Sequence, residues 1–483
     1  MNVLLITLDQ FRADCLSIAG HPIVKTPHLD RLARNGVRFA KHYSQCAPCS
    51  PGRASLYTGM YQMNHRVVAN GTPLDRRFDN VALLARRAGY APTLFGYTDQ
   101  AADPRDTNSS TDPRLFTYEG VLPGFDCELS IPEPFELWIN HLRANGFDVP
   151  MNSFQSLNTE PDRPEEFSIG AFVADHVNSW LRKQDGPWFA HASFLRPHPP
   201  YAAAGKWSKE YDPADVPMPI EPSANRHSLH EAALHMSQSA APKDEAGKRR
   251  MRAQYYGMVS EVDSQVGRVL DTLTELGMWD NTMIIVTADH ADQLGDHGLR
   301  EKLGYFEQSY HILGIVRDPR NSQSHGSTIG EFTENVDIVP TVADAIGQPV
   351  PLQCDGLPLT TFLEGSHPEQ WRKAASYEFD WRQIFITKEG HAWPSDRRLE
   401  RQNLAVRRSH DAAYVQFGDG TWLAFDLAAD PTWRTTMDDP ARVLPLAQDM
   451  LTWRSQNTER TLTGFLVQDG GMGHWPAGVP WKE

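Results

Sequence analysis

The chain has 483 residues, of which 40% are hydrophobic and 22% are charged, and its 46 basic and 61 acidic residues give a net charge of −15 at pH 7. This is the composition of an ordinary globular protein, which excludes a disordered or fibrous chain. The excess of acidic residues excludes nucleic acid as the main partner, because such a partner requires a basic surface, but it leaves room for a small anionic substrate. At about 150 residues per domain the length suggests roughly three domains, and one large α/β domain with a smaller companion fits equally well.

The sequence contains no segment typical of a membrane or secreted protein. No stretch approaches the ~18 apolar residues of a membrane span. The first residues carry neither a basic region nor a long apolar stretch of the signal-peptide type. We therefore expect a soluble, cytoplasmic protein without a membrane partner.

The first two thirds of the chain alternate apolar strands with amphipathic helices. Residues 2–8 form a short, continuous apolar run, which predicts a buried strand. Thr26 and Pro27 begin a helix that Gly36 ends. The other elements that we predict are, in chain order, strand 37–42, helix 80–87, strand 91–97, helix 169–184, strand 188–194, helix 245–276, strands 282–287 and 312–316, and helix 336–346. This alternation predicts an α/β fold with a largely parallel sheet sandwiched by helices.

The C-terminal part has a different pattern. Residues 413–417 and 422–427 flank a Gly-Asp-Gly turn, which predicts a β-hairpin, and a helix is predicted over 441–456. We expect a main domain over residues 1–370 and a small C-terminal α+β subdomain, with antiparallel sheet, helix and arm, over 371–483.

Two kinds of segment connect or extend these elements. Residues 100–168 and 197–243 are rich in Pro, Asp, Asn and Ser, and are predicted to be long loops over a pocket. The tail after Gly464 is predicted to be an arm. Exposing the side chains of Trp475 and Trp481 to water costs free energy. We therefore predict that this arm contacts another copy of the chain in a homo-oligomer, a dimer or a tetramer.

Polar side chains follow three of the predicted strands. Asp9, Thr98-Asp99 and Asp289-His290 each come directly after a strand. Ligands of open α/β sheets bind beyond the carboxyl ends of the strands. One such residue alone is often only a turn former, but three groups of this kind predict a shared site for metal binding or proton transfer.

The segment around Cys49 predicts a nucleophile. The thiol lies just before Pro51, which suits the start of a helix, and Arg53 falls in the first turn. The helix dipole and an arginine together stabilise an anionic nucleophile and an anionic substrate. The alternative is a buried structural cysteine.

Cys49-Ser50-Pro51-Gly52-Arg53 followed by Ala54-Ser55-Leu56-Tyr57-Thr58-Gly59 resembles the motif of the sulfatase family, within the alkaline phosphatase superfamily. In that family the cysteine is oxidised after translation to formylglycine. The resemblance extends over most of the chain: the end of strand 2–8 and residues 89–98, 287–297, 335–347 and 371–381. It implies an alkaline phosphatase/sulfatase-like fold and a formylglycine-generating maturation enzyme as a partner.

The resemblance also implies roles for single residues. One divalent cation would be held by Asp9, Asp289, His290 and the modified Cys49. Carboxylates and an imidazole suit Mn²⁺, Zn²⁺ or Ca²⁺. Three further side chains would act on the ester: Arg53 orients the formylglycine hydrate, Lys302 reaches the ester oxygens or the leaving group, and His198 assists at the leaving group. The metal would activate one hydroxyl of the hydrate for attack on sulfur or phosphorus, and the second hydroxyl would release the product.

Several positions depart from the common sulfatase pattern. Gln10 stands where many sulfatases have a second aspartate, which shifts the expected metal from Ca²⁺ toward a transition metal, and Tyr97 and Asp99 replace a lysine and a histidine. With Asn70, these departures look closer to the phosphonate monoester hydrolase/phosphodiesterase branch, which also hydrolyses sulfate esters. We assign substrate binding to Gln10, Asn70, Tyr97 and Lys302, add Tyr97 and Asp99 to the catalytic residues, and name Asp99 as a candidate base.

The predicted function is metal-dependent, arylsulfatase-like hydrolysis of sulfate monoesters, with promiscuous hydrolysis of phosphonate monoesters and phosphodiesters. All three are small monoanionic esters, which match the expected charge of the site better than a phosphate monoester dianion. The alternative is a phosphonate monoester hydrolase/phosphodiesterase as the main activity.

Two readings from other classes compete with this function. The pair Cys46 and Cys49 has the spacing of a thiol redox motif. The altered residues Asp99, Ala291 and Asp292 would also fit a relative that binds such esters without turnover. Five cysteines, an odd and sparse set, make a disulfide framework unexpected.

Overall fold

The computed structural model describes residues 1–224, 226–382, 399–468, 471–474 and 479–480. A nine-stranded sheet forms the centre of the molecule, with strand order β10-β2-β9-β7-β1-β6-β4-β5 and β8 paired to β2. Its strands are β1 (Asn2–Leu8), β2 (Val37–Tyr43), β4 (Thr93–Gly96), β5 (Asp126–Ser130), β6 (Phe189–Phe194), β7 (Thr282–Thr287), β8 (His311–Ile312), β9 (Gly314–Arg317) and β10 (Thr328–Glu334). Strands β8 and β9 run antiparallel to their neighbours and the other pairings are parallel. The predicted α/β fold with a largely parallel sheet is confirmed.

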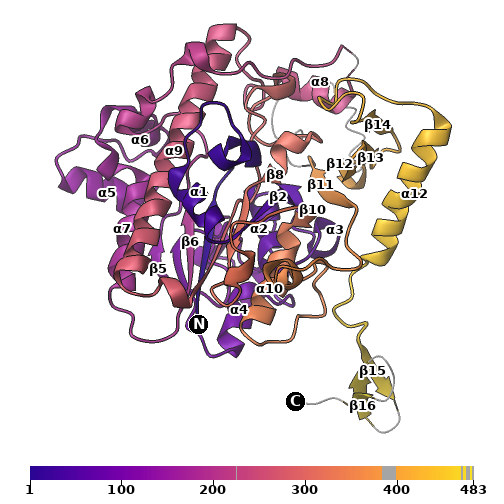
Figure 1. The fold of residues 1–483 in the computed structure, drawn as a ribbon, viewed down its shortest axis with the longest axis horizontal. Coiled ribbons are helices and arrows are strands. Elements are labelled where there is room, and N and C mark those ends of the chain that lie inside the picture. The colour runs from indigo at the N-terminus through magenta and orange to yellow at the C-terminus, as the bar shows by residue number, and fades with distance from the viewer. Residues whose placement is uncertain (225, 383–398, 469–470, 475–478, 481–483) are drawn as a thin grey trace.

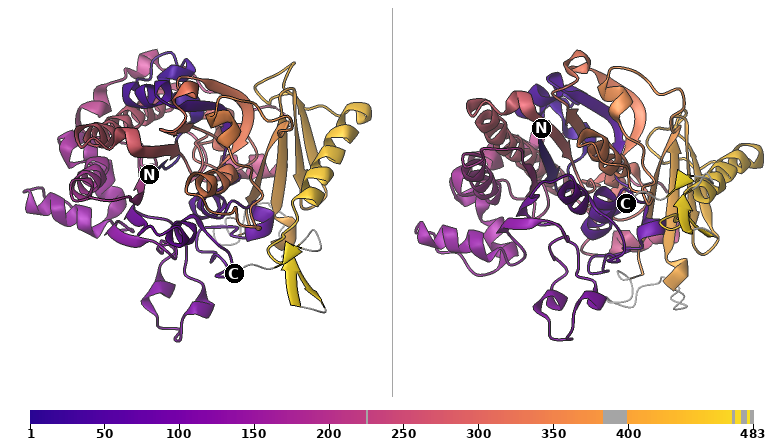
Figure 2. Two further views of the ribbon diagram at one scale, coloured as in Figure 1. Left: turned by 60° about the horizontal axis from the view of Figure 1, so that its bottom comes forward. Right: turned by 90° about the horizontal axis from the view of Figure 1, so that it is seen from below.

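Helices cover both faces of this sheet (Figures 1 and 2). The described α-helices are α1 (Pro27–Arg34), α2 (Cys49–Thr58), α3 (Gln62–His65), α4 (Val81–Arg87), α5 (Glu136–Ala144), α6 (Ser153–Asn158), α7 (Ile169–Leu181), α8 (Ser228–His235), α9 (Glu245–Glu275), α10 (Ile338–Ala345), α11 (Thr360–Leu363) and α12 (Pro440–Gln456). No helix in this part of the chain is long and apolar enough to cross a membrane.

Strand β1 shows why the two faces bury different helices. Leu4, Ile6 and Leu8 pack with the apolar side chains of α1, α7 and α9. Val3 and Leu5 point to the opposite face, where they pack with α2, α4 and α10. Because side chains alternate along a strand, a fully apolar strand is what a sheet with two covered faces requires.

A second sheet lies beside the main one, with strand order β14-β13-β12-β11-β3. Its strands are β3 (Cys46–Ala47), β11 (Ala374–Asp380), β12 (Asn403–Ser409), β13 (Ala412–Phe417) and β14 (Trp422–Asp426). The predicted hairpin is present as the antiparallel pair β13–β14. Helix α12 packs against this sheet through Met450 and Trp453. Strand β3 comes from the segment just before α2 and pairs with β11, so the second sheet touches the chain directly beside Cys49.

Several predicted elements have different bounds in the structure. The strand predicted over 312–316 is two short strands, β8 and β9, and the helix predicted over 336–346 begins with a 3₁₀ turn at Asn335–Asp337. Strand β10 was not predicted, because its sequence TIGEFTE contains a glycine and two glutamates that are depleted in strands.

The two segments predicted as long loops hold short elements. Residues 100–168 contain β5, α5 and α6, and residues 197–243 contain α8. These elements are too short to show a clear hydrophobic period in the sequence. In the C-terminal arm the structure describes strands β15 (Phe465–Gln468), β16 (Gly471–His474) and β17 (Val479–Pro480). Trp475 and Trp481, on which the arm prediction rests, lie outside the described residues.

Candidate active site

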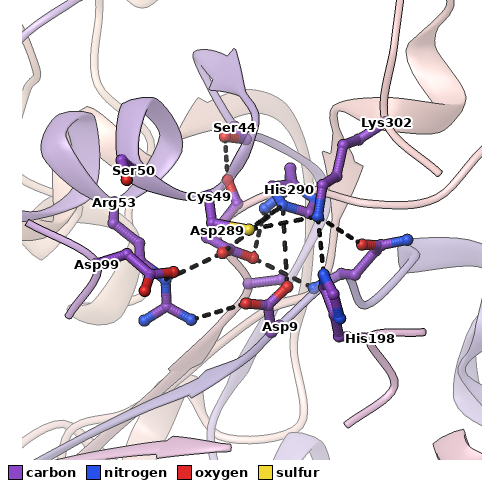
Figure 3. Close-up of polar contacts among 12 residues, drawn as sticks. Asp9, Ser44, Cys49, Ser50, Arg53, Asp99, His198, Asp289, His290 and Lys302 are labelled. Carbon is purple, nitrogen blue, oxygen red and sulfur yellow. Dashed lines mark hydrogen bonds and ion pairs between the residues drawn. The ribbon is translucent and has the colours of Figure 1, made fainter. Parts of the chain in front are cut away.

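The predicted site residues meet at the carboxyl-end edge of the parallel strands (Figure 3). Asp9 follows β1 directly, Asp289 and His290 follow β7, and Tyr97 and Asp99 follow β4. The loops after β6 and β7 add His198 and Lys302. The strand order brings these segments together, because β7, β1, β6 and β4 are neighbours in the sheet.

Helix α2 places Cys49 over this edge. Cys49 is the first residue of α2, and Gly52 lets the helix approach the end of β7. A Cβ atom at Gly52 would lie 2.4 Å from the carbonyl oxygen of Asp289, so only glycine fits. As a result, Cys49 Sγ lies 3.3 Å from His290 Nε2 and 3.3 Å from Lys302 Nζ.

Four side chains offer ligand atoms for one metal ion. The ligand atoms of Asp9, Cys49, Asp289 and His290 all lie within 4.8 Å of one another, and all four residues are buried. Asp9 Oδ1 is buried without a hydrogen-bond partner among the described residues. A buried carboxylate oxygen in that state is costly unless a cation binds it. Carboxylate oxygens and an imidazole nitrogen are suitable ligands for a divalent cation, so this site fits one.

Arg53 holds the outer oxygens of both carboxylates. Its Nη2 donates to Asp9 Oδ2 at 3.1 Å and its Nε to Asp289 Oδ2 at 3.0 Å. The Tyr97 hydroxyl donates to the same Asp9 oxygen at 2.7 Å. Asp9 Oδ1 is thereby left to face His290 Nε2 at 3.8 Å, while Asp289 Oδ1 accepts from the backbone N–H groups of Gln10 at 3.2 Å and His290 at 2.9 Å. The structure therefore places Arg53 and Tyr97 behind the metal ligands.

The electrostatics of the two carboxylates fit a cation site. Burial, with the neighbouring Asp9 carboxylate adding to it, raises the pKa of Asp289 to about 7. Burial would also raise the pKa of Asp9, but His198 and Arg53 outweigh it and hold that pKa below its usual value. Two adjacent buried carboxylates resist ionising together, and a divalent cation between them removes this conflict.

The thiol of Cys49 is not a stabilised anion. Burial raises its pKa well above the usual value, and the Asp9 carboxylate raises it further. The sequence argument from the helix dipole and Arg53 is wrong for the thiol itself, because the guanidinium is occupied by carboxylates.

The Lys302 ammonium lies beside Gln10, Cys49 and His198. Its Nζ donates to Gln10 Oε1 at 3.0 Å and lies 3.0 Å from His198 Nε2. Burial, with the nearby Lys302 ammonium adding to it, lowers the pKa of His198 to about 4. His198 Nδ1 lies 2.8 Å from the carbonyl oxygen of Pro199, so the neutral ring carries its proton on Nδ1 and accepts from Lys302 on Nε2.

A cavity of about 440 Å³ opens above Cys49. Of the predicted site residues, it is lined by Asp9, Cys49, Asn70, Tyr97, Asp99, His198 and Lys302. Asn70 also accepts a hydrogen bond from the backbone N–H of Ser50 at 3.0 Å, which holds the first turn of α2. Gln10, which was predicted to bind substrate, does not line this cavity, because it is fully buried behind Lys302.

Sequence reasoning missed the outer wall of the cavity. Tyr118, Glu119, Glu133, Phe135, Leu157, Gln238 and Ser239 line it. All come from the two segments that were predicted to be long loops over a pocket, without any residue of them being singled out. No pattern in the sequence singles out these residues, since each residue type is ordinary on a surface.

The thiol redox alternative finds no support in the geometry. All five cysteines are free thiols. Cys46 Sγ lies 3.3 Å from the hydroxyl of Ser55, and burial raises the thiol pKa of Cys46 as it does that of Cys49. A redox pair requires an attacking thiolate, which both environments disfavour.

Comparison with known proteins places this site in a family. Residues 1–348 match the family Sulfatase, and residues 295–450 match the family N-sulphoglucosamine sulphohydrolase, C-terminal. The multifunctional alkaline phosphatase superfamily protein PehA of Trinickia caryophylli is 36% identical, with 98% of each chain covered. An arylsulfatase of Clostridium perfringens is 26% identical over 77% of this chain and 80% of its own.

Two solved structures are similar over nearly the whole chain. The phosphonate monoester hydrolase of Agrobacterium radiobacter has a TM-score of 0.90 and 40% identity, with 98% of this chain and 99% of its own covered. The phosphonate monoester hydrolase SpPMH from Silicibacter pomeroyi has a TM-score of 0.88 and 34% identity, with the same coverage. The chain is therefore a hydrolase that belongs to the sulfatase family of the alkaline phosphatase superfamily.

Proposed function

We propose that this chain hydrolyses small monoanionic esters above Cys49, with phosphonate monoesters preferred and sulfate monoesters and phosphodiesters also accepted. The observation that carries the proposal is the position of Cys49 at the base of an open cavity, between a metal-binding group and Lys302. The sequence alone favoured sulfate esters, with phosphonate monoester and phosphodiester hydrolysis as the alternative main activity. The similarity to two phosphonate monoester hydrolases leads us to propose that alternative.

The proposal includes a metal ion and a modified residue. Asp9, Asp289, His290 and residue 49 would hold one divalent cation, Mn²⁺, Zn²⁺ or Ca²⁺, which would polarise the ester and favour an ionised hydroxyl nearby. We propose that a maturation enzyme converts Cys49 to formylglycine, whose hydrate provides two hydroxyls on one carbon. The match of residues 1–348 to the Sulfatase family and the position of Cys49 at the start of α2 support this.

Lys302 is the proposed proton donor to the leaving group. Although burial alone would lower its pKa, the nearby acidic groups raise that pKa above the usual value, so Lys302 stays protonated at neutral pH. His198 accepts from Lys302 on Nε2 and is fixed through Nδ1 by the Pro199 carbonyl. We propose that His198 aims the ammonium at the leaving oxygen.

Asp99 is the proposed proton acceptor on the other side of the cavity. It lines the cavity, and its Oδ1 is buried without a hydrogen-bond partner among the described residues. Burial raises the pKa of Asp99 well above its usual value, which makes its carboxylate a stronger base than an exposed one. Arg53 Nε lies 3.6 Å from Asp99 Oδ2 and forms an ion pair with it.

We also propose a cellular compartment for the enzyme. Five free cysteines fit a reducing compartment, which supports a cytoplasmic enzyme.

The test is a panel of esters with one leaving group. The values of kcat/KM would be measured for 4-nitrophenyl phenylphosphonate, 4-nitrophenyl sulfate and bis(4-nitrophenyl) phosphate, with enzyme co-produced with a maturation enzyme and loaded with each metal. We expect turnover of all three and the highest kcat/KM for the phosphonate. A sulfate preference above about a hundredfold, or ~2.7 kcal/mol of transition-state binding, would restore the sulfatase as the main activity. No turnover of any ester, with metal bound and Cys49 modified, would instead favour a binding protein.

A further inference from the structure

Gln10 lies buried between Lys302 and Asp292, and its amide has a defined direction. Its Oε1 accepts from Lys302 Nζ at 3.0 Å, and its Nε2 donates to Asp292 Oδ2 at 2.5 Å. An ammonium group can only donate, so the oxygen end of the amide must face Lys302. The other end then requires an acceptor, which Asp292 provides.

Asp292 is surrounded by donors alone. Its Oδ2 also accepts from the Tyr201 hydroxyl at 2.8 Å, and its Oδ1 accepts from the backbone N–H groups of Leu294 at 2.7 Å and Glu301 at 3.0 Å. Asp292 is fully buried. Four donors around one buried carboxylate leave it a single role as acceptor, so the direction of the Gln10 amide is fixed.

The same carboxylate holds the backbone that carries Lys302. Glu301 immediately precedes Lys302 and has a φ of 60°, a left-handed conformation that costs free energy in a residue with a side chain. Its N–H is the group that donates to Asp292 Oδ1. Asp292 therefore contacts both the base of the Lys302 segment and, through Gln10, the charged end of its side chain.

We infer that Asp292 is a positioning residue, which sets the direction of the Gln10 amide and thereby holds Lys302 Nζ between Cys49 and His198. This rests on the proposed function, because Lys302 is the proposed proton donor there. Asp292 touches none of the reacting atoms, and Gln10 lies behind Lys302 and outside the cavity.

The substitution Asp292→Asn reverses the chain of hydrogen bonds. The asparagine Oδ1 can still accept from Leu294 and Glu301, which places its Nδ2 donor against Gln10. The Gln10 amide must then flip and turn its own NH₂ group toward Lys302, so that two donors face each other. We expect kcat to fall by about 10- to 100-fold, because the ammonium is displaced from its position over Cys49.

A second substitution restores the direction of the hydrogen bond from Lys302 to residue 10. In the double variant Asp292→Asn/Gln10→Glu, one oxygen of the new carboxylate accepts from the asparagine and the other accepts from Lys302. The total charge is the same as in the wild type. Tyr201→Phe is the matched control, since it removes one hydrogen bond from Asp292 and leaves the direction of the amide unchanged. We expect it to lower kcat by less than about threefold.

The experiment compares kcat and KM of the wild type, Asp292→Asn, Gln10→Glu, the double variant and Tyr201→Phe, with metal content measured for each because residue 10 adjoins Asp9. The inference is supported if Asp292→Asn loses at least about tenfold in kcat and the double variant regains most of that loss. It is overturned if Asp292→Asn is within about threefold of wild type, or if the double variant is no more active than Asp292→Asn alone.

Binding of phenylphosphonate by calorimetry separates this inference from the proposed function. If the wild type turns over no ester, the proposed function fails. The hydrogen bonds from Asp292 through Gln10 to Lys302 (the relay) still predict that phenylphosphonate binds more weakly to Asp292→Asn and that the double variant regains the affinity. Equal affinity of the wild type, Asp292→Asn and the double variant would count against the relay itself.

Discussion

The Tyr97 hydroxyl fixes one oxygen of Asp9 and leaves the other for a cation. It donates to Asp9 Oδ2 at 2.7 Å, and the Tyr97 ring lies against the Arg53 guanidinium, 4.3 Å from the ring centroid. A hydrogen bond from behind a metal ligand orients that ligand and tunes its affinity. This contact gives Tyr97 a role that does not depend on touching the ester.

We expect Tyr97→Phe to weaken metal binding by about 10- to 100-fold, since the ring stays and only the hydrogen bond to the ligand is lost. Metal affinity would be measured by competition with a chelator. Tyr57→Phe is the matched control, because Tyr57 is equally buried and its hydroxyl accepts from Arg53 Nη1 at 3.3 Å without contacting Asp9. Similar affinity of both variants would contradict the role of Tyr97.

The contact between α2 and the end of β7 depends on one missing side chain. An added Cβ at Gly52 would lie 2.4 Å from the Asp289 carbonyl and 3.0 Å from that of Cys46. Both neighbours are backbone atoms, which cannot rotate away. The approach of the helix that carries Cys49 to the strand that carries Asp289 is therefore set by this glycine.

Gly52→Ala should lower the free energy of unfolding by about 3 kcal/mol, because the helix or the strand end must shift to relieve the contact. Denaturant unfolding would measure it. Gly330→Ala, in strand β10, is the control, since an added Cβ there meets nothing within 4 Å. If both substitutions had the same small effect, the close approach would not be what holds α2 in place.

Helix α9 contributes an acceptor to the start of α1. Asp263 accepts from the backbone N–H groups of His28 at 3.2 Å and Leu29 at 2.7 Å, which are unpaired donors of the first turn of α1. Burial nevertheless raises the pKa of Asp263 from 3.8 to about 7. The folded state therefore binds this proton more tightly than the unfolded state does.

The raised pKa of Asp263 makes the free energy of unfolding fall as the pH rises. The stabilising contribution of the Asp263 proton is fully present below about pH 4 and is lost as the pH rises through about 7. Between pH 5 and pH 8 the wild type should lose about 3 kcal/mol of stability relative to Asp263→Asn, which cannot titrate. Chemical unfolding of both proteins across this range measures the difference. A difference that is independent of pH, or that changes in the opposite direction, would refute the shift.

The sequence predicts the elements of the main sheet better than those around it. Strands β1 and β7 both have the predicted bounds, because a strand buried on both faces is a continuous apolar run. The sequence analysis missed strand β10 and helix α5 for different reasons. The first contains a glycine and two glutamates, which are depleted in strands, and the second is a short helix within a polar segment.

At the scale of the whole molecule, the sequence predicts which residues converge but not what surrounds them. The strand-end rule and the family motif bring Asp9, Cys49 and Asp289 together before any coordinates are known. The second sheet touches this centre through β3, a strand of only two residues that no pattern reveals. The cavity wall that would select the leaving group likewise comes from the segments 100–168 and 197–243, where residue type alone carries no signal.

The C-terminal arm extends away from the body of the molecule (Figure 1). Val467 on it is 82% exposed. Apolar side chains on an extended arm are costly in water unless a partner covers them, which keeps a dimer or tetramer as our prediction.

Removing residues 465–483 tests this prediction. We expect the full chain to sediment as an oligomer and the shortened chain as a monomer with an unchanged melting temperature, since Arg460 still pairs with Asp355 at 2.8 Å. An oligomeric shortened chain, or a monomeric full chain, would be inconsistent with an arm-mediated contact.

The most direct test of the account is the loss of one side chain at the base of the cavity. Hydrolysis of 4-nitrophenyl phenylphosphonate would be measured for the wild type and for Cys49→Ala, both co-produced with a maturation enzyme and loaded with the same metal. If residue 49 provides the nucleophile, kcat should fall by at least about 10³-fold while the remaining three metal ligands stay in place. Equal turnover by the two proteins would show that the chemistry does not take place at residue 49.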